Sequence, residues 1–247
     1  MNQTRIIPTL SWAYISRCSA VAVCVPFLIL ALTGCGTAPT AKIPFKPGAT
    51  VETLASVVTL SIKVPGNSTG GRGYMLYQRP DKFHLVMLTP FGTTAMESFV
   101  AGEHLTIMIP SKGEAYTGTF ADIPADSSLR GWQMMRLMGA EKAFYDPLRR
   151  GETEKRIGAL GEVTSYYDGS GLLKEEVFSG GEKVFFHDYR SVEGVPFPCI
   201  TEYTDSSGAS VRITFDQPEI NGVLDKSALI PDLEGLIVLP LTRFKGI

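Results

Sequence analysis

The sequence predicts an α+β fold, in which one large antiparallel β-sheet carries a short helical segment on one face. Three observations support this fold class. Short runs of β-forming residues recur along the chain, turn signals rich in Gly and Pro separate them, and a single segment has the apolar spacing of a helix. The chain after residue 34 is long enough for one domain with a substantial core.

The predicted strands follow one another through most of the chain. They are residues 56–64, 74–78, 82–88, 94–100, 104–110, 114–120, 162–168, 172–178, 183–189, 199–204 and 210–215. The Gly-rich segment 65–73 between the first two lacks the Lys-Ser/Thr ending of a phosphate loop, so we expect a turn there. Consecutive antiparallel strands at this spacing predict one meandering sheet or a barrel.

Residues 127–150 depart from this pattern. Apolar residues recur there three positions apart, at Leu129, Trp132, Met135 and Met138. This spacing predicts a helix that ends near Gly139, followed by a short helix over 141–145, and the two would cover one face of the sheet. The methionines beside Trp132 allow two interpretations: they pack in the core, or their flexible thioethers line a pocket for variable apolar ligands.

The N-terminal region resembles a bacterial lipoprotein signal. Residues 1–19 contain Arg5 and Arg17 and no acidic residue, and a short apolar run follows over 20–35. The run ends in Leu-Thr-Gly-Cys, the form of a lipobox. The resemblance implies that residues 1–34 are removed and that Cys35 is acylated. The alternatives are an ordinary signal in which Cys35 is incidental, or an uncleaved anchor helix.

Residues 35–50 are predicted to be a flexible tether between the lipidated cysteine and the folded body. Residues 36–50 contain three prolines and few residues that favour order. Gly36 stands where an aspartate commonly retains lipoproteins in the inner membrane, so by analogy we expect the outer membrane. A tether of this kind would let the body face the periplasm away from the bilayer surface.

Charge and cysteine content exclude some classes of protein. Removal of Arg5 and Arg17 takes the formal net charge from −2 to −4, which argues against nucleic-acid binding. The signal also contains Cys18 and Cys24, so beyond Cys35 only Cys199 remains and no internal disulfide can form. We expect Cys199 to be a buried small apolar residue.

The sequence contains no recognisable catalytic motif. His84, His104 and His187 lack the spacing of metal ligands, and no Gly-x-Ser-x-Gly nucleophile motif is present. We therefore expect a protein that is not an enzyme and has no metal or cofactor.

One turn has unusual chemistry. Residues 89–93 read Thr-Pro-Phe-Gly-Thr between two predicted strands, where Pro90 and Gly92 suit a tight turn. The residue between them is Phe91 rather than a polar residue. Phe91 either protrudes from the hairpin or folds back over the edge of the sheet.

Taken together, these features resemble the LolA/LolB lipoprotein-localisation family, and the layout is closest to LolB. The lipobox, the strand meander, the "LTPFG" turn, the helical insert with Trp132 and the closing segments 189–203 and 215–231 carry the resemblance. LolB has an Asn-Pro-Leu-Gly turn in the corresponding place. The resemblance implies that residues 51–247 form an open, strongly curved antiparallel sheet (a half-barrel) with helices plugging its concave face.

The resemblance also implies a function. Such proteins hold acyl chains between the sheet and the helices, and the matching turn, here Pro90, Phe91 and Gly92, would insert into the outer membrane. Alternation along two strands and one face of the predicted helix together make seven residues candidates for the acyl cavity: Met75, Tyr77, Phe83, Leu85 and Met87 from the strands, and Trp132 and Met135 from the helix. The expected partners are the bilayer, through acylated Cys35, the acyl chains of lipoprotein cargo and a periplasmic LolA-type carrier, with the chain itself a monomer.

Two other functional classes stay open at this point. The chain could be a structural envelope lipoprotein, or it could bind another amphiphile such as a glycolipid or a lipid-linked polymer. A closed core without space for a ligand would favour the structural class.

Overall fold

The structure is a computed structural model that describes residues 45–64, 66–123, 143–158 and 161–245. Cys35, Trp132 and Met135 lie outside the described residues, and so does most of the predicted helical segment. The folded unit that contains the described residues spans 43–247.

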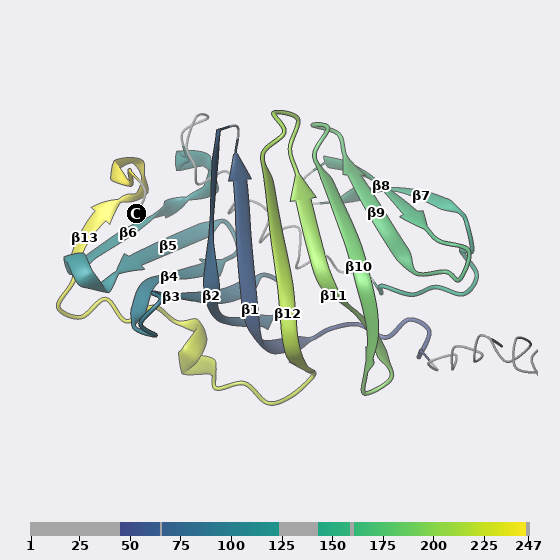
Figure 1. Cartoon of the computed structure of the whole chain (residues 1–247), viewed down its shortest axis with the longest axis horizontal. Helices are drawn as coiled ribbons and strands as arrows, with labels where there is room; N and C mark the ends of the chain where they lie inside the picture. Colours follow the sequence, from purple (N-terminus) through teal and green to yellow (C-terminus); the bar gives the residue numbers. More distant parts are fainter. Residues whose placement is uncertain (1–44, 65, 124–142, 159–160, 246–247) are drawn as a thin grey trace, which may run out of the picture. The chain divides into compact units, whose positions relative to one another are not determined.

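The described residues form one sheet of 13 strands (Figure 1). In chain order the strands are β1 (Thr53–Val64), β2 (Asn67–Gln78), β3 (Lys82–Leu88), β4 (Thr94–Ala101), β5 (His104–Ile109), β6 (Glu114–Thr119), β7 (Thr153–Gly158), β8 (Gly161–Tyr167), β9 (Leu173–Phe178), β10 (Lys183–Val192), β11 (Val195–Thr204), β12 (Ser210–Ile220) and β13 (Ile237–Pro240). Their order in the sheet is β13-β6-β5-β4-β3-β2-β1-β12-β11-β10-β9-β8-β7.

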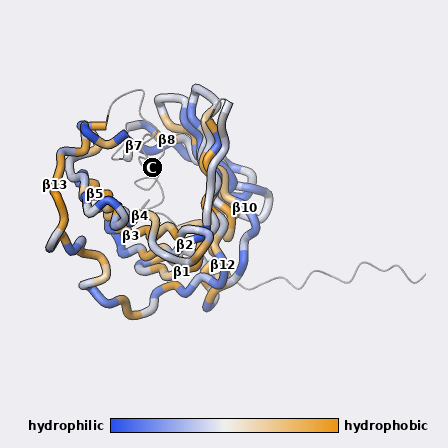
Figure 2. The backbone as a smooth tube through the Cα atoms, turned by 60° about the vertical axis from the view of Figure 1, so that its left-hand side comes forward, coloured by the Kyte–Doolittle hydropathy of each residue, from blue (hydrophilic) through white to orange (hydrophobic). Residues whose placement is uncertain are grey.

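Two meanders of antiparallel strands meet in the middle of this sheet. The first runs from β1 to β6 and the second from β7 to β12, and β1 joins them by pairing with β2 on one side and β12 on the other. The only parallel pair in the described sheet is β13 with β6, in which Ile237 lies opposite Glu114. Figure 2 shows the strands following one another round a strong curve.

The prediction of an α+β fold with helices plugging the concave face is wrong. The described residues form an open sheet and contain no α-helix, only 3-10 turns. Where the short helix was expected, Tyr145 instead forms a β-bridge with Leu172. The next residues form a turn. The Asp146 side chain accepts from Leu148 N at 2.9 Å, and Arg149 N donates to Asp146 O at 3.1 Å. Pro147 suits this turn because it has no N–H to satisfy.

The Gly-rich segment is also not the turn that the sequence predicted, because residues 67–73 form the first half of β2. The glycines allow neighbouring backbones to approach closely. A Cβ atom at Gly73 would overlap the carbonyl oxygen of Val86, and one at Gly70 would overlap that of Leu60. Glycine is therefore required by the sheet itself at these positions.

Most of the apolar residues lie on one face of the sheet, which we call the core face. On β3 it carries Phe83, Leu85 and Met87, which alternate with less buried residues and are at most 9% exposed. Full burial of such side chains contributes about 1.5–3 kcal/mol each to stability. Cys199 is buried on β11, which confirms its predicted packing role, and burial raises the pKa of its thiol.

The opposite face, which we call the outer face, is covered in part by the C-terminal segment. A small cluster there joins Phe99, Met108 and Ala115 to Leu233 and Leu236. The 3-10 turn η5 (Lys226–Leu229) in the same segment packs near β3. The chain after β12 therefore crosses the outer face of the first meander before it enters the sheet as β13.

Candidate functional site

A pocket opens on the core face in the middle of the sheet. Its empty volume is about 570 Å³, a figure that includes space open to solvent. Most of the lining residues come from six strands that are adjacent in the sheet, in the order β3-β2-β1-β12-β11-β10. The lining residues are Thr50, Val51, Leu54, Met75, Tyr77, Arg79, Phe83, Phe144, Phe186, Phe197, Pro198, Thr201 and Phe215.

Aromatic rings form much of this lining. The ring of Phe144 lies 5.5 Å from that of Phe186 and 6.4 Å from that of Phe197, and Phe197 packs edge-to-face on Phe215 at 5.2 Å. On the other side, Tyr77 and Phe83 are cross-strand partners with ring centroids 4.7 Å apart. Such a surface binds apolar groups by removing them from water, at about 25 cal/mol per Å².

Polar groups hold one part of the pocket's wall in place. Arg79 Nη1 donates to Glu52 Oε1 at 2.7 Å, and Thr50 Oγ1 donates to the same carboxylate at 2.8 Å. The hydrogen bond from Thr50 and the pairing with Arg79 lower the pKa of Glu52. The carboxylate therefore stays charged at neutral pH and ties the chain before β1 to the turn after β2.

The core face becomes more polar towards β7. Glu176 on β9 is fully buried and lies opposite Val184 on β10. Val184 shares a face of β10 with the pocket residue Phe186, two positions later. The Glu176 carboxylate accepts from Ser165 Oγ at 2.8 Å and pairs with Arg156 Nη2 at 3.3 Å. The face that carries the pocket is therefore apolar in its centre and charged at one side.

The structure brings together some of the predicted cavity residues. Met75, Tyr77 and Phe83 line the pocket, whereas Leu85 and Met87 are buried on the core face outside its lining. Leu85 and Met87 continue the face of β3 from Phe83 towards the turn at Phe91, about 13 Å along the strand at 3.3 Å per residue. That these side chains contact acyl chains stays a prediction.

Sequence reasoning missed four aromatic residues of the pocket, Phe144, Phe186, Phe197 and Phe215. The signal for three of them was present. Phe186 is two residues from the buried Val184, Phe215 is two residues from Ile213, and Phe197 is two residues from Cys199, so each shares a strand face with a buried apolar residue. Two-residue spacing thus indicates lining residues in the second meander as it does in the first.

The turn between β3 and β4 holds Phe91 out in solvent. The side chain is 93% exposed, so the ring does not fold back over the sheet edge. The turn closes on itself: Thr89 N donates to Thr93 O at 2.8 Å, and Gly92 N donates to Thr89 O at 2.9 Å with Gly92 at φ +81°. The Thr89 hydroxyl also accepts from Phe91 N at 3.3 Å. The N–H groups of the turn therefore have acceptors within the turn itself, without any contribution from the ring.

The described histidines form no metal site. Across residues 45–64, 66–123, 143–158 and 161–245 there is no cluster of His, Cys, Asp and Glu able to hold a metal ion. His84 instead pairs with Glu97 at 3.0 Å and stacks on Phe99 on the outer face. In the same ranges no helix has the length and apolar character needed to span a membrane.

Residues 45–50 are the part of the predicted tether that the structure describes. Lys46 N donates to Gly194 O at 2.8 Å, and the ring of Phe45 lies 5.5 Å from that of Tyr145. These residues therefore contact the folded body. The boundaries at 34 and 50 stay a prediction.

Comparison with known proteins gives structural neighbours only. No protein-family model and no curated protein matches the chain. Solved structures that it resembles include a LolA superfamily protein from Nitrosomonas europaea, with 13% identity, a TM-score of 0.49 and coverage of 72% of this chain and 90% of that one.

Two further neighbours have similar values. One is a DUF1329 family protein from Desulfovibrio piger, with 10% identity, a TM-score of 0.48 and coverage of 73% and 90% of the two chains. The other, from Vibrio parahaemolyticus, is described as an outer membrane lipoprotein-sorting protein domain, with 10% identity, a TM-score of 0.48 and coverage of 72% and 88%. Likenesses at this level carry no argument about function, which the pocket and the turn must supply.

Proposed function

We propose that this chain is an outer-membrane-anchored lipoprotein, facing the periplasm, that binds acyl chains and receives and inserts other lipoproteins without covalent catalysis. The observation that carries the proposal is the exposed ring of Phe91 on a turn that closes through its own hydrogen bonds. Acylation of Cys35 would hold the body at the membrane, and a periplasmic LolA-type carrier would supply the cargo.

The exposed ring supports a membrane role because it contributes little to the fold. Thr89 and Thr93 already satisfy the backbone of the turn, and the Phe91 side chain is almost entirely in water. A ring at this position gains about 1.5–3 kcal/mol if it leaves water, and aromatic rings favour the interface of a bilayer.

The pocket supports the binding step of the same proposal. Its lining is mostly aromatic and aliphatic, and Arg79, which pairs with Glu52 outside the lining, stands in one part of the wall, so the pocket suits the apolar chain of an amphiphile. The buried residues Leu85 and Met87 extend the apolar face of β3 from the pocket towards the turn. An acyl chain could therefore leave the pocket along a continuous apolar surface.

Replacement of Phe91 by Glu tests the proposal. We expect the free energy of unfolding of Phe91→Glu to lie within about 0.5 kcal/mol of the wild-type value, because the side chain is exposed. Uptake of an acyl probe should also be unchanged. Delivery of bound lipoprotein into acceptor vesicles should fall strongly, since a carboxylate resists entry into the interface.

Two control variants make this test specific. Phe91→Leu keeps an apolar tip and should retain delivery. Ile157→Glu adds the same charge at another side chain that is 90% exposed, on β7, and should also deliver normally. If Phe91→Glu folds, binds and delivers like the wild type, the turn has no part in insertion and the proposal fails.

A further inference from the structure

Exposed side chains from three separate elements share one rim of the sheet. Antiparallel pairing brings together Leu88 and Thr94 at the ends of β3 and β4, and Ile109 and Glu114 at the ends of β5 and β6. Glu114 in turn lies opposite Ile237, the first residue of β13. We call this edge the rim; it consists of the turn 89–93, the 3-10 turn η2 (Pro110–Lys112) with Gly113, and residues 237–238.

The spacing of the rim follows from the strand order. β3 and β13 are separated by β4, β5 and β6, and neighbouring strands lie about 4.8 Å apart, so the rim extends over about 19 Å. Phe91 stands at one end, Ile237 at the other, and Lys112 lies between them. These three side chains come from separate parts of the sequence, and they lie on one edge only because the strands pair in this order.

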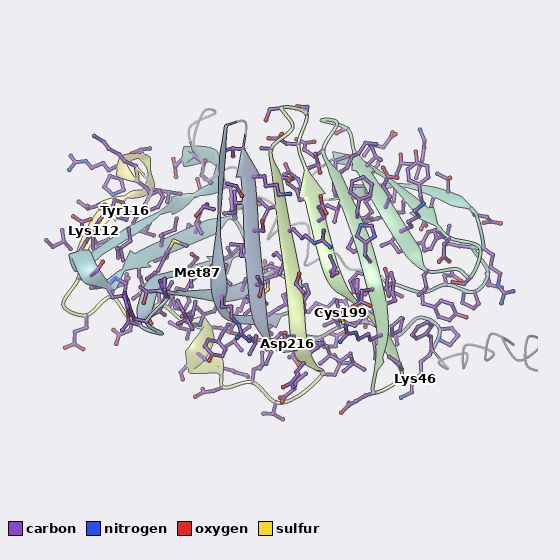
Figure 3. The ribbon with its side chains drawn as sticks, in the orientation of Figure 1. Lys46, Met87, Lys112, Tyr116, Cys199 and Asp216 are labelled. Atoms are coloured by element: carbon purple, nitrogen blue, oxygen red, sulfur yellow. The ribbon has the colours of Figure 1, made fainter. Side chains whose placement is uncertain are left out.

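The three side chains have the chemistry of a membrane interface. Phe91 is 93% exposed and Ile237 63% exposed, although both are large and apolar. Lys112 is exposed and makes no ion pair with any described residue, and Figure 3 shows it at the left-hand end of the sheet. Aromatic and aliphatic side chains enter the interfacial region of a bilayer, while lysine extends to the headgroups.

We propose that this whole rim, rather than Phe91 alone, is the surface that contacts a phospholipid bilayer. Phe91 and Ile237 enter the interface, and Lys112 contacts headgroup phosphates. The inference rests on the proposed function, because it takes Phe91 as one of its contact points. It adds a second insertion point on β13 and a basic residue between the two.

The occupant is a lipid surface rather than a strongly acidic partner. The exposed residues Asp232 and Glu234 precede β13, so the neighbourhood of the rim is not a broad positive patch. A surface that offers isolated phosphates and an apolar layer fits one lysine flanked by two apolar side chains. Contacts about 19 Å apart also fix the orientation of the body on the bilayer, which a single ring at Phe91 does not.

Site-specific labelling of the full chain tests the inference. Phe91→Cys, Ile237→Cys and Ile230→Cys would each carry a polarity-sensitive fluorophore, and the chain without an introduced cysteine gives the blank. Ile230 is the matched control, because it is also isoleucine, is 65% exposed and lies in the same C-terminal segment directly after η5. The vesicles contain phosphatidylethanolamine and phosphatidylglycerol, with spin-labelled lipids as quenchers.

We expect labels at 91 and 237 to shift to shorter wavelength and to be quenched on vesicles, while the label at 230 stays unchanged. Lys112→Glu should weaken the shift at 237, and added salt should remove that difference. A label at 237 that behaves like the one at 230, with insertion at 91 intact, would overturn the rim and leave the proposed function standing. Loss of both signals would overturn both.

Discussion

At the scale of single residues, Gly73 shows how closely the centre of the sheet is packed. It pairs with Val58 on β1 and Met87 on β3, and a Cβ atom there would overlap Val86 O and stand 3.3 Å from the Cα of Met87. To remove the overlap, β2 and β3 would have to move apart, and the backbone hydrogen bonds between them would be lost.

Gly73→Ala should therefore destabilise the protein by at least about 2 kcal/mol, because backbone rather than a flexible side chain must move. Urea unfolding would measure the change. Gly169→Ala is the matched control, since nothing lies within 4 Å of a Cβ at Gly169, and its unfolding should stay within about 0.5 kcal/mol of the wild type. Equal stabilities of the two variants would show that β2 is looser than described.

Cys35 is the residue on which the proposed anchoring depends. Cys35→Ala should leave an uncleaved precursor, because lipobox processing requires the acylated thiol. Intact mass measurement of the wild type should show an acylated Cys35 at the N-terminus, and the variant should retain residues 1–34. An unmodified Cys35 at the mature terminus of the wild type would rule out the lipid anchor.

Phe91 also shows where sequence reasoning stops at this scale. Pro90 and Gly92 were enough to predict a tight turn. They could not decide whether the ring protrudes, because that depends on the direction in which the turn leaves the sheet. In the structure the ring is 93% exposed, and the Thr89 hydroxyl accepts from Phe91 N and Thr93 N within the turn.

At the scale of elements, alternation located most strands, and the failures have physical causes. The predicted range of β3 matches the structure, whereas β7 and β13 were missed. β7 lies at the edge of the sheet and is charged, with Lys155 and Arg156 in place of apolar residues. β13 has only four residues, and nothing local in them indicates that they pair with β6.

The pocket depends on elements that the sequence could not bring together. β1 and β12 pair although they lie far apart along the chain: Leu54 lies opposite Ile220, 166 residues later (220 minus 54). This pairing places Met75 and Phe83 from the first meander across from Phe197 and Phe215 of the second. Alternation predicts which face each residue occupies, but not which distant strands become neighbours.

Closure of the pocket's wall should block uptake of acyl probes. Thr50→Trp places a large ring at the lining, and it should reduce saturable uptake of a fluorescent fatty acid by a form that lacks the anchor. Thr59→Trp, at an exposed position on the outer face of β1, is the control and should bind normally. If the unmodified protein shows no saturable uptake, the core is closed and the pocket holds no acyl chain.

At the scale of the folded unit, the apolar pocket and the exposed rim lie towards different ends of β3. Phe83 lines the pocket, Met87 lies near the turn, and the core face between them stays apolar. One curved sheet thus combines an apolar pocket with a rim of exposed apolar side chains. That combination fits transfer of an acylated cargo better than a structural role, which needs neither feature.

Native mass spectrometry of the protein taken from its own envelope tests the central claim most directly. The account predicts a population in which the chain carries an additional acylated lipoprotein that dissociates when the complex is activated. Phe91→Glu should retain that cargo, since the pocket lies away from the turn. A chain that carries only its own N-terminal modification, with no acylated ligand in any preparation, would contradict the account.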